Sequence, residues 1–280
     1  MSDAKVTDDA MLTERATLPT YYVSHGGGPW PWMMDQMPFD MSILQHSLQA
    51  MPAEVGVTPK AVLVVSAHWE TREFTVQTHP NPPMLYDYGG FPEFTYHVQY
   101  PAPGDPEVAA RVRELLSEAG IPSLEDPDRG FDHGMFAPMY VAWPHADVPM
   151  LQLSILRNFD PKAHFAAGRA LAPLRDEGVL IVGSGLSYHN LRLFGPAAAE
   201  PSAQFDQWLS TTLMDTPAPQ RTSALESWEQ APSARIAQPR EDHLIPLMVA
   251  LGAAEDQQAV RTYHETDMAG GITASSFRFG

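Results

Sequence analysis

Three histidines stand at the ends of apolar, strand-like segments. The run 61–67, Ala-Val-Leu-Val-Val-Ser-Ala, leads directly into His68, and shorter apolar runs precede His25 and His189. Unbroken runs rich in β-branched residues and too short for a helix are typical of strands buried on both faces. In open α/β sheets, ligands bind at the carboxyl ends of such strands. If the three strands are parallel neighbours, their imidazoles meet at one edge, which predicts a metal site.

The elements that must position these histidines alternate along the chain. Strands are expected at 18–24, 61–67, 149–155, 179–184, 259–265 and 273–279, with an edge strand at 73–78. Helices are expected at 41–48, within the Met- and Leu-rich stretch 33–49 and with Asp40 as a possible N-cap, and at 105–119, 135–143, 161–177, 202–230 with a break at Pro217, and from residue 242 onward. This alternation predicts an α/β fold: a three-layer α/β/α sandwich around a central, mostly parallel, mixed sheet.

No shift in composition divides the chain, so one catalytic domain is expected at residues 19–280. Residues 1–18 are polar and lack an apolar core, which is typical of a flexible N-terminal tail and not of a signal peptide. Residues 79–106 are rich in proline, glycine and aromatic residues. A segment of this length and composition favours an ordered wall or lid over the site.

The charge balance and the absence of cysteine narrow the partners. Thirty-four acidic residues against 17 basic ones give a formal charge of −17, which disfavours nucleic acid and anionic membranes. Without cysteine, a metal must be held by His, Asp or Glu, and this favours iron, zinc or manganese. No apolar run is long enough to span a bilayer, so a cytoplasmic location is expected.

An esterase is one alternative. His25-Gly26-Gly27-Gly28 matches a string that forms part of the oxyanion hole in lipases, and residues 185–189, Gly-Leu-Ser-Tyr-His, resemble a nucleophile elbow around Ser187. An elbow requires glycine where His189 stands, and the residues that follow do not have a helical pattern. These two departures count against an esterase that uses HGGG and Ser187.

Seven separated motifs, in order, resemble those of the DODA-type extradiol aromatic ring-opening dioxygenases, a branch of the class III (protocatechuate 4,5-dioxygenase-like, LigB) superfamily. The resemblance covers roughly residues 19–280. The motifs are Ser24-His25-Gly26, Ser66-Ala67-His68-Trp69, Asp87 to Pro92, Tyr100 to Gly104, Gly130 to Gly134, Val182 to Leu191 and Asp242 to Leu247.

The resemblance implies the α/β/α fold with a mixed sheet and one mononuclear divalent metal, usually Fe(II), with Zn(II) in some members. Carried over position by position, it makes His25, His68 and His243 the metal ligands. It gives His189 the role of catalytic acid and base, or of a fourth ligand. It places His133 beside the substrate or behind the ligands, as a second catalytic histidine.

This sequence differs from the wider superfamily at the third ligand, which is a glutamate in that superfamily. The aligned residue is His243, so Glu241 and Asp242 are alternative ligands. Three neutral imidazoles leave the full dipositive charge on the ion, whereas a two-histidine, one-carboxylate triad leaves one unit of charge.

The implied reaction cleaves the ring of a small aromatic diol with O2 beside the two hydroxyls and gives a semialdehyde. A metal chelated by a catechol lowers the pKa of its hydroxyls, and His189 would accept a proton from the diol. Asp87, Tyr88 and Trp69 are the expected substrate contacts. The alternatives are a zinc-dependent hydrolase on the same scaffold and a non-catalytic metal- or aromatic-binding module. The sequence does not indicate an oligomeric state.

Overall fold

The computed structural model describes residues 17–280, and eight strands in this range form one mixed sheet in the order β4-β3-β5-β2-β6-β1-β8-β7. The strands are β1 (Thr20–Ser24), β2 (Ala61–Thr71), β3 (Phe74–Gln77), β4 (Ser123–Asp126), β5 (Met150–Leu156), β6 (Val179–Gly185), β7 (Ala259–Met268) and β8 (Ile272–Phe279). The four central strands β5, β2, β6 and β1 are parallel. Antiparallel pairs of strands join β1 to β8, β7 to β8 and β3 to β5.

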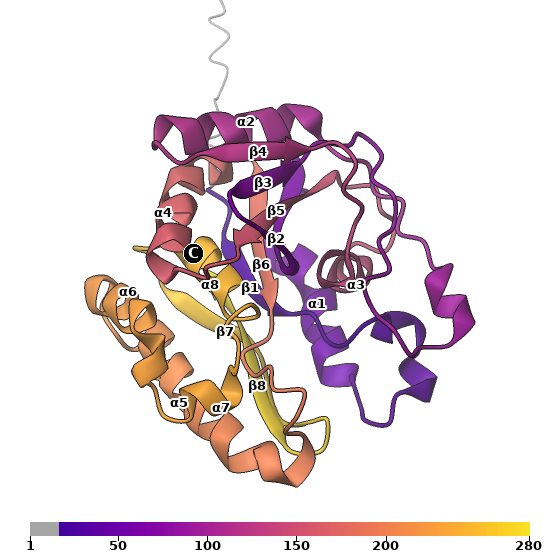
Figure 1. The fold of residues 1–280 in the computed structure, drawn as a ribbon, viewed down its shortest axis with the longest axis vertical. Coiled ribbons are helices and arrows are strands. Elements are labelled where there is room, and N and C mark those ends of the chain that lie inside the picture. Colours follow the sequence, from indigo (N-terminus) through magenta and orange to yellow (C-terminus); the bar gives the residue numbers. More distant parts are fainter. Residues whose placement is uncertain (1–16) are drawn as a thin grey trace, which may run out of the picture.

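Helices cover both faces of the sheet, so the predicted three-layer sandwich is confirmed (Figure 1). The helices are α1 (Ser42–Val55), α2 (Pro106–Glu118), α3 (His133–Ala142), α4 (Pro161–Leu171), α5 (Ala199–Met214), α6 (Ala218–Glu226), α7 (Ala234–Ala237) and α8 (Ile245–Gly252). α1 and α3 lie on one face, and α4, α5 and α8 lie on the other. Every residue of α8 is buried, because this helix packs against both the sheet and α4.

β6 lies between β1 and β2, and this order brings the three apolar runs together. Ser184 of β6 is in register with Ser66 of β2, and Gly185 is in register with Ser24 of β1. All three strands run in the same direction, so their carboxyl ends meet at one edge of the sheet. The expectation of parallel neighbours is therefore confirmed.

Two expected elements have different positions in the structure. The predicted edge strand at 73–78 is the shorter β3, and it is interior because β4 pairs with its outer side. β4 has four mostly exposed residues and no apolar alternation, so the sequence pattern did not indicate it. The helix expected at 41–48 begins at Ser42, whose amide donates to Asp40 Oδ1 at 2.8 Å, and it continues beyond the expected end to Val55.

Two finer expectations, the cap of α2 and the break at Pro217, agree with the structure. Asp105 caps α2 by accepting a hydrogen bond from the Val108 amide at 2.9 Å. The helical stretch 202–230 is divided at Pro217 into α5 and α6.

The expected tail at 1–18 falls mostly outside the described residues, and Leu18 within it is buried in the core. No helix in the range 17–280 is long and apolar enough to cross a membrane.

His164 on α4 is a structural histidine that is fully buried beneath the sheet. Its Nδ1–H donates to the Asp160 carbonyl at 2.7 Å, and its Nε2 accepts from the Leu156 amide at 3.0 Å. Burial lowers the pKa of His164 to about 4. The folded protein therefore holds this imidazole neutral and hydrogen-bonded on both sides.

This state predicts a pH-dependent stability. Because the folded pKa lies below the unfolded value, the stabilisation is complete above pH 6.5 and is lost as the pH falls toward 4. Between pH 7.5 and pH 5 the free energy of unfolding should fall by about 2 kcal/mol more in the wild type than in His164→Gln. Urea denaturation at the two pH values measures this difference. Equal losses in both proteins would contradict it.

Candidate metal centre

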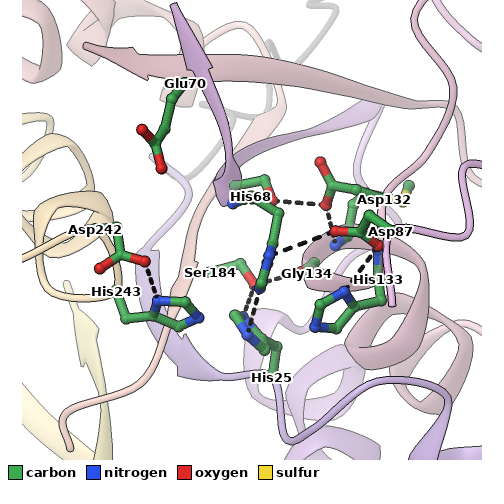
Figure 2. A network of polar contacts seen from close by, with 12 residues as sticks. His25, His68, Glu70, Asp87, Asp132, His133, Gly134, Ser184, Asp242 and His243 are labelled. Atoms are coloured by element: carbon green, nitrogen blue, oxygen red, sulfur yellow. Dashed lines mark hydrogen bonds and ion pairs between the residues drawn. The ribbon is translucent and has the colours of Figure 1, made fainter. Parts of the chain in front are cut away.

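Five histidines from five separate segments meet at the carboxyl edge of the sheet. His25 directly follows β1, His68 lies within β2, and His189 follows β6. His133 is the first residue of α3, and His243 lies two residues before α8. Figure 2 shows His25, His68, His133 and His243 turned toward a common space. His189 is stacked on His243.

His68 lies inside a strand, and not just past its end as the sequence predicted. β2 continues to Thr71, but its register with β5 shifts between Val65 and Glu70. Pairing of β2 with β6 ends at Ser66. His68 therefore stands where the regular ladder is interrupted, and irregularities of this kind re-aim a side chain.

The rings of His25, His68 and His243 form a nearly equilateral triangle. Their centroids lie 4.9 Å (His25 to His68), 4.9 Å (His68 to His243) and 5.0 Å (His25 to His243) apart. One ligand nitrogen from each lies within 4.8 Å of the other two. The Nε2 atoms of His25 and His68 are 3.2 Å apart, and two nitrogens each about 2.1 Å from one ion would be about 3.0–3.4 Å apart.

The Nδ1 side of His25 and of His243 faces a hydrogen-bond acceptor. Ser184 Oγ donates to the Gly134 carbonyl, so it accepts the Nδ1–H of His25 at 3.1 Å. The Nδ1–H of His243 is donated to Asp242 Oδ2 at 2.9 Å. With the proton on Nδ1, Nε2 carries the free lone pair that a metal ligand needs.

A single carboxylate serves the other two rings. The Nδ1 of His133 lies 2.8 Å from Asp87 Oδ1, and the Nδ1 of His68 lies 3.4 Å from Asp87 Oδ2. Burial opposes ionisation of Asp87, but the hydrogen bonds from His133 and the electrostatic attraction of His133 and His68 together outweigh it and lower the pKa of the carboxyl group. Asp87 is thus an anion behind two imidazoles.

The imidazoles of His25, His68, His189 and His243 are neutral near pH 7. Burial lowers the pKa of His68 and of His189 to about 4. Burial, together with the neighbouring histidines, lowers the pKa of His25 and of His243 well below its usual range. A neutral imidazole is the form that ligates a metal, so the donor set fits a divalent cation such as Fe(II) or Zn(II).

His189 differs from the other four histidines in how it is held. Its ring is stacked on His243 with centroids 3.3 Å apart and planes 17° apart, and its backbone N–H donates to the Ala237 carbonyl. Among residues 17–280, no side-chain partner fixes either ring nitrogen of His189. Both nitrogens are thus available for proton transfer, and the ring is less constrained than a rigid ligand.

The two carboxylates that the sequence left as alternatives to His243 have other partners. Glu241 forms an ion pair with Arg235 at 2.7 Å. Asp242 lies behind His243 and accepts its Nδ1–H. The geometry favours His243 itself as the third ligand, with Asp242 orienting its ring.

The esterase motif has a different explanation in the structure. Ser187 is buried, and its Oγ accepts from the Ser275 amide, so no histidine activates it. Gly26 has a φ of +75° and lies under the indole of Trp30, whose Nε1–H donates to the His25 carbonyl at 2.7 Å. Gly185 leaves room for the His243 backbone, where a Cβ would collide with the carbonyl oxygen.

Asp132, which the sequence did not single out as a site residue, connects several parts of the centre. This fully buried carboxylate accepts hydrogen bonds from Ser66, Gln152 and Arg129, each at 2.7 Å. It also caps α3 through the Met135 amide. Polar serines inside the apolar runs, Ser66 and Ser184, were the available signal for these supporting residues.

The expected substrate contacts are revised in part. Trp69 is 5% exposed and its ring lies 4.9 Å from the Arg129 guanidinium, so its position favours packing over substrate contact. Both oxygens of Asp87 face histidines. The position of Tyr88 best fits a substrate contact. Its ring lies 5.9 Å from that of His133, and its hydroxyl donates to the Thr95 carbonyl.

Ser184 supplies a test of how the ligands are supported. Replacing Ser184 by Ala leaves the His25 Nδ1–H and the Gly134 carbonyl without partners in a buried region. The free energy of unfolding of the metal-free protein should fall by about 1–3 kcal/mol. Ser47→Ala is the control, because that hydroxyl donates only to Leu44 within α1. Equal urea midpoints for wild type and Ser184→Ala would refute the assigned hydrogen bonds.

Comparison with known proteins identifies the family of this chain. Residues 19–280 match the family described as the catalytic LigB subunit of aromatic ring-opening dioxygenase. A 4,5-DOPA dioxygenase extradiol of Beta vulgaris is 36% identical over 93% of this chain and 96% of its own length. The Escherichia coli K12 protein of the same name is 34% identical over 98% of both chains. The crystal structure of the uncharacterized Escherichia coli K12 protein JW3007 superimposes with a TM-score of 0.75 at 30% identity, over 94% of this chain and all of the other. The chain therefore belongs to the LigB family of aromatic ring-opening dioxygenases.

Proposed function

We propose that this dioxygenase cleaves the ring of a catechol-type substrate in the extradiol position, with one divalent metal held by His25, His68 and His243. Fe(II) is the foremost candidate for the metal, and Zn(II) is the alternative. The observation that carries the proposal is the triangle of three neutral imidazoles, each with its Nδ1 beside an acceptor. A metal bound there would lower the pKa of a chelated diol and bring the ring and O2 together.

The charge around the triangle supports a divalent cation. Three neutral imidazoles do not offset the charge of the cation. The carboxylates of Asp87 and Asp242, however, lie directly behind the rings of His68 and His243. Asp242 accepts the Nδ1–H of His243, and Asp87 Oδ2 lies 3.4 Å from the Nδ1 of His68, so both carboxylates raise the basicity of the ligands without occupying positions on the ion. Positions on the ion are thereby left for a diol and for dioxygen.

His189 and His133 are proposed to handle protons. The imidazole of His189, whose nitrogens have no side-chain partner among residues 17–280, accepts a proton from the diol and later donates a proton to the ring-opened product. It can accept the first proton because its pKa of about 4 keeps the ring unprotonated at neutral pH. His133 presents its Nε2 from the opposite side, since Asp87 engages its Nδ1. Two relatives are named for 4,5-DOPA, so dihydroxyphenylalanine is the first substrate to test.

The activity is tested by loading the metal-free protein with Fe(II) without oxygen and then adding air and a panel of catechols. We expect oxygen uptake and the yellow absorbance of a semialdehyde with at least one diol. A zinc hydrolase would instead turn over an ester or amide with Zn(II) and consume no oxygen. Saturable catechol binding without oxygen uptake under any metal would indicate a binding module.

Substitutions separate the ligands from the proton-transfer residue. His189→Ala should retain one equivalent of iron and lose about 10²–10⁴-fold in kcat. His25→Ala and His68→Ala should lose the iron itself. His46→Ala is the control, because His46 is exposed on α1 and its ring is hydrogen-bonded only to the Ser42 carbonyl. Metal analysis and oxygen uptake measure both effects, and retained iron in His68→Ala would overturn the ligand assignment.

A further inference from the structure

Ser184, Asp242 and Asp87 are the three acceptors that lie behind the proposed ligands. Of these, Asp87 is the one that does not come from the core of the fold. It lies in the wall loop, the segment of residues 78–105 between β3 and α2. Three N–H groups converge on its carboxylate. His133 donates from its backbone at 2.9 Å and from Nδ1 at 2.8 Å to Oδ1, and His68 Nδ1 lies 3.4 Å from Oδ2. Figure 2 shows this carboxylate between the two rings.

The other two acceptors serve one ring each. Ser184 belongs to β6 and accepts from His25 alone, and Asp242 accepts from the neighbouring His243. Asp87 contacts both a proposed ligand, His68, and a proposed proton-transfer residue, His133.

The wall loop holds Asp87 in place from both sides. Before it, the Leu85 amide donates to the Phe131 carbonyl and the Phe131 amide donates to the Pro83 carbonyl, each at 2.8 Å. Next to it, the Tyr86 hydroxyl donates to the Val98 carbonyl at 2.8 Å. The first part of the loop is therefore fixed both to the later part of the same loop and to the segment that leads into His133. A change in the order of the loop moves the carboxylate.

We infer that Asp87 is a positioning residue that ties the metal affinity of the triangle to the order of the wall loop. The inference rests on the proposed function only in taking His25, His68 and His243 as metal ligands. Asp87 fixes the proton of His68 on Nδ1 and leaves Nε2 free for the metal. A bound metal in turn fixes His68, which holds Asp87 and with it the loop.

The substitution Asp87→Asn tests this because an amide offers one acceptor and one donor where the carboxylate offers two acceptors. The amide oxygen can keep both bonds to His133, and the NH2 group then faces the Nδ1–H of His68. That arrangement removes the acceptor from His68 and favours the wrong tautomer. Loss of such an outer hydrogen bond typically weakens metal binding by about 10–100-fold.

The primary measurement is the dissociation constant for Zn(II), obtained by competition with a chromophoric chelator. We expect Asp87→Asn to bind Zn(II) about 10–100-fold more weakly than the wild type. Glu93→Gln is the matched control on the same loop, because Glu93 is exposed and contacts only His97. Its affinity should stay within about 2-fold of the wild type, the size expected of an exposed pair.

The second measurement is amide hydrogen exchange of residues 84–100 with and without Zn(II). In the wild type, Zn(II) should slow exchange in this range, whereas in Asp87→Asn it should have little effect. Tyr86→Phe removes one anchor of the loop, leaves the carboxylate intact and keeps the ring. It should weaken Zn(II) binding in the same direction by a few-fold, and it tests the inference even if Asp87→Asn does not fold.

The outcomes separate this inference from the proposed function. Unchanged Zn(II) affinity in Asp87→Asn, or in Tyr86→Phe if the first variant is unfolded, would overturn the positioning role and leave the activity standing. Weakened binding and lost loop protection, together with a wild type that cleaves no catechol with Fe(II), would refute the proposed activity and support the positioning role.

Discussion

The centre depends on where one proton sits on each imidazole. A histidine in a buried cluster presents a lone pair to its neighbours only if its other nitrogen carries the proton, and this requires an acceptor behind each ring. Ser184, Asp242 and Asp87 provide those acceptors. Burial then lowers the pKa of His25, His68 and His243, so the rings stay neutral. Without these acceptors, the buried rings would have polar nitrogens that lack hydrogen-bond partners, which costs free energy of folding.

The fold supplies these acceptors through the position of β6. This strand lies between β1 and β2 and therefore carries Ser184 to a point beside His25. It also ends in a glycine, Gly185, where the backbone of His243 approaches too closely for a side chain. The His243 carbonyl is held there by the Tyr22 hydroxyl at 2.8 Å and the Leu186 amide at 3.1 Å. The third proposed ligand is thus positioned by its backbone as well as by its ring.

Beneath the rings, one buried ion pair links the layers. Asp132 is fully buried, yet all of its partners are polar: Arg129 provides the charge, and Ser66 and Gln152 come from β2 and β5. A buried carboxylate is tolerated only when its hydrogen-bonding capacity is filled in this way. Because Asp132 also caps α3, it fixes the helix on which His133 is the first residue. The position of His133 relative to His68 follows from this arrangement, with ring centroids 3.9 Å apart.

The sequence by itself determined the layers, the parallel central strands and the gathering of His25, His68 and His189 at one edge. Apolar runs and the alternation of strands with helices can be read from the sequence, and they predict these features on the condition that the three strands are parallel neighbours, which the sheet order meets. The resemblance to the dioxygenases added His133 and His243. Only the tertiary structure decided the outer contacts: Asp87 behind two rings, Ser184 behind His25, Asp132 beneath β2, and β4 as the true edge of the sheet. Hydrogen bonds between residues 46 to 159 positions apart leave no periodic trace in a sequence, because they depend on how separate elements pack.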